Sequence, residues 1–187
     1  MASLYELTIP VLTRVLRTEE SLLKKAEEHA KTTGTPVEEL VAARLAPDMF
    51  SLSKQVGVTV LFARIVSHLL AGKELPPTQI GEWSLEENYS FIAGALELLA
   101  EIKPEDLNGR ESEIISFNYV NGKYSSYFNT TLKLRASNAN NFADVTRFLV
   151  PSVYFHLTTL YDILRHKGVP LGKANYLEHL VADWEFS

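Results

Sequence analysis

The sequence predicts a mainly α-helical fold, an antiparallel four-helix bundle, formed by a single domain over residues 1–187. Two observations lead to this prediction. Apolar residues recur at helical spacing in four long segments. Each segment is bounded by capping residues, glycine or proline, which are the residues that begin and end helices. A chain of this length fits one domain with a single large core, and its 46% apolar and 22% charged residues are typical of a globular protein.

The first two long segments differ in how much of their surface is apolar. Residues 4–33 carry one apolar stripe, with Pro10 near the start, and Gly34 follows as the stop. Thr35 then caps a short helix. The second long helix is expected over 47–71. It is apolar on more than one side, which is typical of a central helix.

A small β-hairpin insertion is expected between the third and the last long helix. Ser84 opens a capping box for the third helix, which is expected to end near Ile102. Residues 113–124 then read as strand, turn and strand around Asn121-Gly122, and residues 130–134 read as a further strand.

The last helix is expected to run from Asn140 to Lys167, where Gly168 ends it. Pro151 lies inside this range and should kink the helix. The tail, residues 172–187, is rich in aromatic side chains, and we expect it to dock on the bundle.

Composition excludes several classes of function. The net charge of −5 disfavours nucleic acid as a partner, because an acidic surface repels phosphate. Without cysteine, disulfides, thiolate zinc sites and thiol nucleophiles are excluded. The N-terminal residues do not have the pattern of a signal peptide, and the apolar runs are too short for a membrane span. We therefore expect a cytoplasmic protein with a small-molecule ligand and no nucleic-acid or membrane partner.

The last helix holds the most informative candidate residues. Tyr154 and Tyr161, seven residues apart, share its core face, and His156 lies at the flank of that face. The tyrosines are either core residues with satisfied hydroxyls or the polar floor of a cavity. His156 is either a packed histidine bonded to a carbonyl or a group with a chemical role.

The run from His156 to Pro170 is the part of the sequence that most resembles a known family. This run has an arginine nine residues after the histidine and Gly168-Val169 about three residues further on. It resembles the last-helix signature of the DinB-like (YfiT-like) helical-bundle superfamily. Residues 3–5, 43–50 and 172–177 resemble one branch of it, found in fungi and bacteria and described only as a domain of unknown function. The resemblance covers nearly the whole chain and implies an antiparallel four-helix bundle that is often a homodimer.

The resemblance also implies a test for a metal site. Metal-binding members of the superfamily place two histidines four residues apart on the last helix and one on the second helix. Here His156 matches the second of the pair, whereas Ser152 stands at the partner position and Val58 lies near the second-helix position. His68 comes too late on that helix. We therefore predict no metal and no cofactor, although oxygen ligands such as Asp48 would be the alternative.

Asp48, Gln55 and Thr59 share one face of the second helix. Asp48 is either a carboxylate at a helix start, where the dipole favours it, or a site residue. If this face meets the last helix, a pocket would combine catalytic and ligand-binding residues. The catalytic candidates are His156, Tyr154, Tyr161 and Asp48, and the ligand-binding candidates are Gln55, Thr59, Ser152 and Thr159.

Three functions follow from these candidates. The first is a metal-independent acid/base enzyme of the isomerase, dehydratase or cyclase type, acting on an apolar or aromatic metabolite in the bundle cavity. The second is a non-catalytic binding or dimeric helical module whose polar core is structural. The third, a divalent-metal-dependent transferase or hydrolase, is what the resemblance implies.

Overall fold

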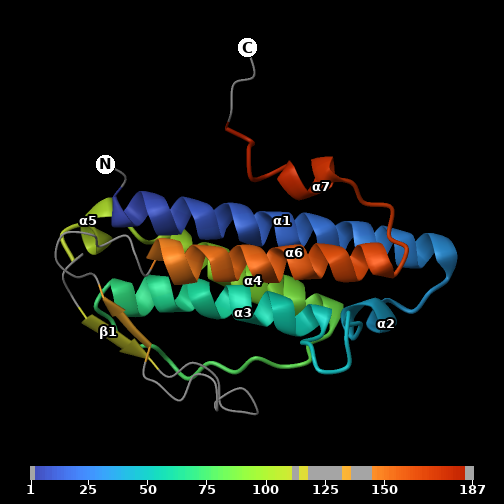
Figure 1. Ribbon diagram of the computed structural model, residues 1–187, viewed down its shortest axis with the longest axis horizontal. Helices are drawn as coiled ribbons and strands as arrows, with labels where there is room; N and C mark the ends of the chain where they lie inside the picture. Colours follow the sequence, from blue (N-terminus) through green and yellow to red (C-terminus); the bar gives the residue numbers. More distant parts are fainter. Residues whose placement is uncertain (1–2, 111–113, 118–131, 136–144, 184–187) are drawn as a thin grey trace.

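Four long helices lie side by side along the long axis of the molecule (Figure 1). The computed structural model describes residues 3–110, 114–117, 132–135 and 145–183. The long helices are α1 (Leu4–Thr33), α3 (Leu52–Ile65), α4 (Leu85–Ala100) and α6 (Val150–His166). Both α1 and α3 contact the other three, so the predicted mainly helical fold is confirmed. In the described ranges, no helix is long and apolar enough to cross a membrane.

Helix α3 is the most enclosed of the four helices. It continues through a π-helical turn, η1 (Val66–Leu70), and most of its side chains are buried, including the polar Ser53, Gln55 and Thr59. This agrees with the prediction of a central second helix. Its start differs from the predicted Pro47, because Ser51 is the capping residue and accepts a hydrogen bond from the Lys54 amide. Residues 47–49 form a turn before the helix.

The sequence predicted an antiparallel bundle, but the four helices are not antiparallel throughout. Ser53 and Asn88, each near the start of its helix, are hydrogen-bonded, so α3 and α4 run in the same direction. The reason is the intervening segment 71–84, which runs back along the bundle (Figure 1). At roughly 3.3 Å per extended residue, this segment can span a helix that rises about 1.5 Å per residue.

Local signals set the ends of α1 and α4. The predicted span of α1 is confirmed, with Gly34 in the left-handed conformation at φ 72° after its last turn. The predicted capping box at Ser84 is confirmed too, since Ser84 and Glu87 exchange hydrogen bonds. The short helix α2 (Val37–Val41) differs, because Pro36 and not Thr35 occupies its capping position. A further short helix, α5 (Pro104–Leu107), follows α4.

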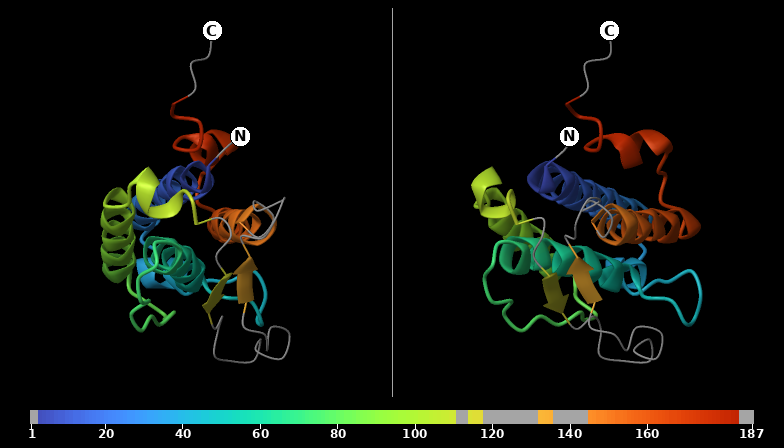
Figure 2. Two further views of the ribbon diagram at one scale, coloured as in Figure 1. Left: turned by 90° about the vertical axis from the view of Figure 1, so that its left-hand side faces the viewer. Right: turned by 60° about the vertical axis from the view of Figure 1, so that its left-hand side comes forward.

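The β element is two short antiparallel strands, β1 (Ile114–Phe117) and β2 (Leu132–Arg135), which lie beside the helices (Figure 2). Ile114 is opposite Arg135 and Phe117 is opposite Leu132. The pairing therefore differs from the predicted hairpin, in which residues 113–117 were joined through Asn121-Gly122 to the next strand. That predicted turn lies outside the described residues.

Helix α6 follows directly on a π-helical turn, η2 (Val145–Leu149). Because the helical backbone continues from η2 into α6, Pro151 lies inside a continuous helical run, as predicted, and the irregular π-helical turn lies just before it. The predicted start at Asn140 lies outside the described residues. Docking of the tail is confirmed for its described part: the short helix α7 (Lys173–Leu177) packs on α1, and Asp183 lies 2.6 Å from Arg14.

Segment 71–84 is held against α3 at close range. The Trp83 amide donates to Ser53 Oγ over 2.8 Å, and the Trp83 ring stacks on Phe91 with centroids 4.0 Å apart. Gly57 lies beneath this segment, where an added Cβ would come within 2.9 Å of Ile80 Cγ2. A side chain at position 57 would therefore push the segment away from the helix.

Two glycine substitutions test this contact. Gly57→Ala should lower the free energy of unfolding by about 1 kcal/mol, because overpacking outweighs the gain in helix propensity. Gly94→Ala, inside α4 with nothing within 4 Å of an added Cβ, should raise it by about 1 kcal/mol. Urea unfolding measures both values. If Gly57→Ala stabilised the protein as much as Gly94→Ala, the close packing of segment 71–84 would be contradicted.

Candidate functional site: a buried histidine–glutamine pair

Helix α6 meets α3 through a polar contact inside the core. His156 Nδ1 lies 2.6 Å from Gln55 Oε1, and the two side chains are 8% and 1% exposed. The structure thus brings together two predicted site residues. It also shows that Gln55, and not Val58, is the residue of the second long helix that faces His156.

The hydrogen bond made by the amide nitrogen of Gln55 shows which nitrogen of His156 carries the proton. The Gln55 amide Nε2 donates to the Phe50 carbonyl over 3.0 Å, so the oxygen of the amide faces the imidazole. An amide oxygen only accepts hydrogen bonds, and His156 Nδ1 must therefore carry a proton. In the neutral imidazole, this leaves Nε2 with its lone pair.

Burial keeps His156 neutral. Loss of solvation disfavours the imidazolium and lowers the pKa of His156 to about 4 from its ordinary 6.5. At neutral pH the side chain is therefore an uncharged base with a defined tautomer. The edge-on ring of Phe155, 5.3 Å away between centroids, adds an apolar neighbour.

One turn further along α3, a second polar contact reaches α1. Thr59 Oγ1 donates to Glu19 Oε1 over 2.8 Å, and neither residue is exposed. Burial raises the pKa of Glu19 well above its ordinary value, against the opposing effect of the Thr59 hydrogen bond. The second carboxyl oxygen, Glu19 Oε2, is also buried and has no hydrogen-bond partner within the described part of the chain.

Glu19 is a residue that the sequence analysis missed. It lies three residues after Leu16 and four before Leu23, on the apolar stripe of α1. A charged residue at a core position of an amphipathic helix is the signal that could have identified it, because a buried carboxyl is rare without a partner or a function.

The structure does not bring Tyr154 and Tyr161 to His156. The Tyr161 ring packs edge-on against Tyr176 of the docked C-terminal segment, with centroids 5.8 Å apart. The pKa of the half-buried Tyr154 is raised by burial and by Tyr176. Both tyrosines therefore belong to the region where the tail docks. The predicted core seam of α6 is confirmed for its fully buried residues Val153, Leu157, Leu160 and Leu164, whereas the two tyrosines are only partly buried, and their role in a site stays a prediction.

The other three candidates are placed differently from one another. Asp48 is exposed in the turn before α3 and is not on that helix. Ser152 is half-buried in the first turn of α6, one turn before His156, and Thr159 is buried nearly one turn after it. Only Thr159 therefore accompanies His156 into the core.

The residues around His156 do not fit the metal site implied by the resemblance. Its Nδ1 donates to an amide, and Ser152 and Gln55 offer a hydroxyl and an amide where imidazoles would be needed. In the described ranges, no three His, Cys, Asp or Glu side chains come together as a metal site.

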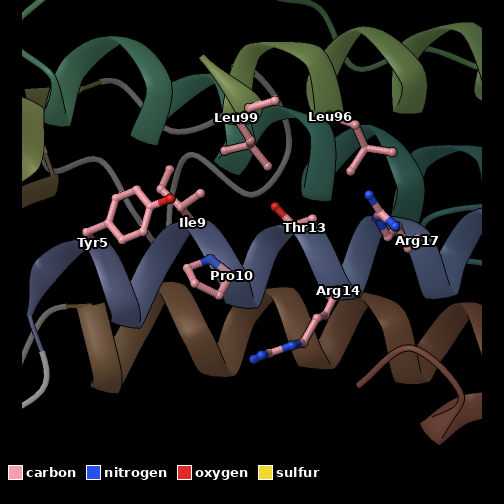
Figure 3. A pocket seen from close by; sticks show the side chains of 9 residues that line it. Tyr5, Ile9, Pro10, Thr13, Arg14, Arg17, Leu96 and Leu99 are labelled. Carbon is pink, nitrogen blue, oxygen red and sulfur yellow. The ribbon is translucent and has the colours of Figure 1, made fainter. Parts of the chain in front are cut away.

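Two hollows open on another part of the surface, between α1 and α4. One, of about 330 Å³, is lined by Tyr5, Ile9 and Thr13 of α1 and by Leu96 and Leu99 of α4 (Figure 3). The other, of about 320 Å³, shares Arg17 and Leu96 with the first. His156 lines neither of them, so the ligand cavity beside it stays a prediction.

Comparisons with known proteins agree with this architecture. A family model described as Domain of unknown function (DUF1993) matches residues 4–177. A DinB family member protein from Shewanella denitrificans has a similar structure, with a TM-score of 0.76 and 28% sequence identity over 93% of this chain and 91% of that chain. A comparison with curated proteins gives no match. The predicted resemblance is thereby confirmed.

The lowered pKa of His156 predicts a loss of stability in acid. The unfolded chain takes up a proton near pH 6.5 and the folded protein only near pH 4, so stability falls as the pH drops through this window. The contribution is about 3 kcal/mol at 1.36 kcal/mol per pKa unit. Urea unfolding from pH 7 to pH 4 should show it, and His156→Gln should remove it. If the free energy of unfolding changed equally with pH in both proteins, the burial of a neutral histidine would be contradicted. The control is His166→Gln, on the exposed last turn of α6.

The raised pKa of Glu19 predicts a change of stability with pH in the opposite direction. Its contribution to stability is fully present below the ordinary pKa of 4.5 and is lost as the pH rises towards the folded value, because the folded protein then holds a proton that the unfolded chain releases. The melting temperature of Glu19→Gln, relative to the unsubstituted protein, should therefore increase by several degrees from pH 4.5 to pH 8. Glu20→Gln, at the neighbouring surface position, should show no such trend.

Proposed function

The chain belongs to the family of the Domain of unknown function DUF1993, and from its buried His156–Gln55 pair we propose that it is a small-molecule-handling protein in which His156 acts as a metal-independent base. The proposed reaction is an isomerisation, dehydration or cyclisation of an apolar or aromatic metabolite. Such reactions need a positioned proton acceptor and donor and no further chemistry from the protein.

The contact between His156 and Gln55 is the observation that supports this proposal. Gln55 accepts from Nδ1 and is itself held by the Phe50 carbonyl, so the imidazole is fixed in one tautomer and one orientation. A base of this kind has its Nε2 lone pair available at neutral pH. In this proposal, Gln55 is a positioning residue and Nε2 is the atom that takes the proton.

Burial supports an apolar ligand. His156 is 8% exposed, it is flanked on its helix by the buried Val153 and Leu160, and it lies against the Phe155 ring. A charged ligand at this place would lose its hydration without a compensating charge, whereas an aromatic ring would gain contacts. Homodimer formation and a cytoplasmic location, expected from the sequence, stay predictions.

A second candidate function, a non-catalytic helical module, is favoured by one observation. The amide of Gln55 is satisfied at both ends inside the protein, as in a structural network that stabilises a core. The two candidates differ in what Nε2 of His156 does: it meets a ligand in the first and stays a static core atom in the second.

Proton exchange at a carbon atom next to a carbonyl tests the first candidate. We expect the protein to accelerate deuterium incorporation into phenylacetone, followed by NMR in D₂O at pD 7. His156→Gln should reduce the acceleration about 100-fold, as general-base catalysis typically contributes that much. Gln55→Leu should reduce it less, because the base remains but its tautomer is no longer fixed.

The imidazole ¹⁵N resonances provide a binding readout that does not depend on turnover. Phenylacetone, phenol and indole should shift the Nε2 resonance of His156 saturably, and His156→Gln identifies that resonance among the five histidines. Exchange at the buffer rate together with an unmoved Nε2 resonance would reject the enzyme in favour of the structural module. The His166→Gln variant should behave as the unsubstituted protein in both measurements.

A further inference from the structure

Glu19 is a buried carboxyl group that the proposed base does not use, and its placement is unusual. It reaches the core from α1, is fully buried, and makes its described hydrogen bond to Thr59 through Oε1 alone. Leaving Oε2 without a partner in the core costs free energy, which calls for an explanation such as a role in binding or an ordered water.

The position of the proton on Glu19 follows from Thr59. Because the Thr59 hydroxyl donates to Oε1, this oxygen acts as the acceptor of the carboxyl group. When the group is neutral and the Thr59 hydroxyl still donates to Oε1, its proton is on Oε2, the atom that has no partner among the described residues. Glu19 then presents an O–H donor inside the core.

Helix α3 relates Glu19 to His156. Thr59, which holds Glu19, and Gln55, which holds His156, are four residues apart on one face of α3, and Thr59 Oγ1 lies 3.5 Å from the Gln55 carbonyl oxygen. Side chains at this spacing have Cβ atoms about 5–6 Å apart. Since α1 and α6 also contact each other, the two groups approach successive turns of α3 from neighbouring helices.

We propose that Glu19 is the acid partner of His156, and that its Oε2–H donates to the carbonyl oxygen of an enolisable aldehyde or ketone bound beside the imidazole. This inference rests on the proposed function and names its substrate class. Two separate contacts, to Gln55 and to Thr59, keep the base and the acid from pairing directly with each other, so both stay available for a ligand.

The step balances without a further reactant. His156 Nε2 takes a proton from the carbon next to the carbonyl, and the electron pair of that C–H bond forms the C=C bond of the enol. The C=O π electrons take the proton from Glu19 Oε2. The enol, an imidazolium and a carboxylate result, and their charges compensate. If the proton on Nε2 is replaced by a deuteron from solvent before it returns to the same carbon, the result is exchange. Where the substrate forms an enediol or a dienol, return to a different carbon gives isomerisation.

Infrared difference spectroscopy tests the donor. The C=O stretching band of the protonated Glu19 carboxyl should be present at pH 7, absent in Glu19→Gln and retained in Glu20→Gln. Phenylacetone labelled with ¹³C at its carbonyl should move this band to lower frequency, because the O–H then donates to the ketone. Propylbenzene, which has the same ring and chain length but no carbonyl, should leave the band where it is.

Affinity gives a second readout. Glu19→Met, whose side chain has no O–H or N–H to donate, should weaken binding of phenylacetone about tenfold and leave binding of propylbenzene unchanged, as expected for the loss of one buried hydrogen bond. The absence of a protonated carboxyl band, or a band that stays unmoved while phenylacetone shifts the His156 Nε2 resonance, would overturn this inference alone. A ketone that moves neither signal would overturn the proposed function and this inference with it.

Discussion

Burial of helix α3 among three other long helices is the constraint on which the rest of the structure depends. A polar side chain on such a helix has to find its partner inside the protein. Ser53 binds the returning segment 71–84, Gln55 binds His156 of α6, and Thr59 binds Glu19 of α1. Each polar residue thus attaches a different neighbour, and together these contacts define how the bundle assembles around its central helix.

The same constraint determines the electrostatics of the core. Burial lowers the pKa of His156 and raises the pKa of Glu19, so both groups are driven towards their neutral forms. A direct contact would instead have favoured an ion pair, with both groups charged. In the described structure, His156 and Glu19 are instead each hydrogen-bonded to an uncharged side chain of α3, Gln55 and Thr59.

Membership in the family establishes the fold and leaves the chemistry to individual residues. In the metal-binding relatives implied by the resemblance, imidazoles of the second and last helices face one pocket. In this chain, the second long helix offers the amide of Gln55, whose oxygen accepts the hydrogen bond from Nδ1 of His156. At these positions, this chain therefore does not offer the imidazoles that the metal site implied by the resemblance would need.

Much of the fold and part of the site could be predicted from the sequence, because the signals are local. Residue spacing along single helices predicted the span of α1 and the capping box of Ser84. The same spacing identified His156, Gln55 and Thr59 as candidate site residues. Helical periodicity tells which residues share a face, but it does not tell which element covers that face. The pattern therefore did not show that Tyr161 packs against Tyr176 of the tail.

The sequence by itself determined that this chain forms long amphipathic helices, with a polar face on the second and a histidine on the last. Only the tertiary structure decided that α3 and α4 run in the same direction, that Gln55 meets His156, and that Glu19 of α1 meets Thr59. The physical reason is that helix formation depends on neighbours a few residues apart, whereas these contacts join residues 35, 101 and 40 positions apart.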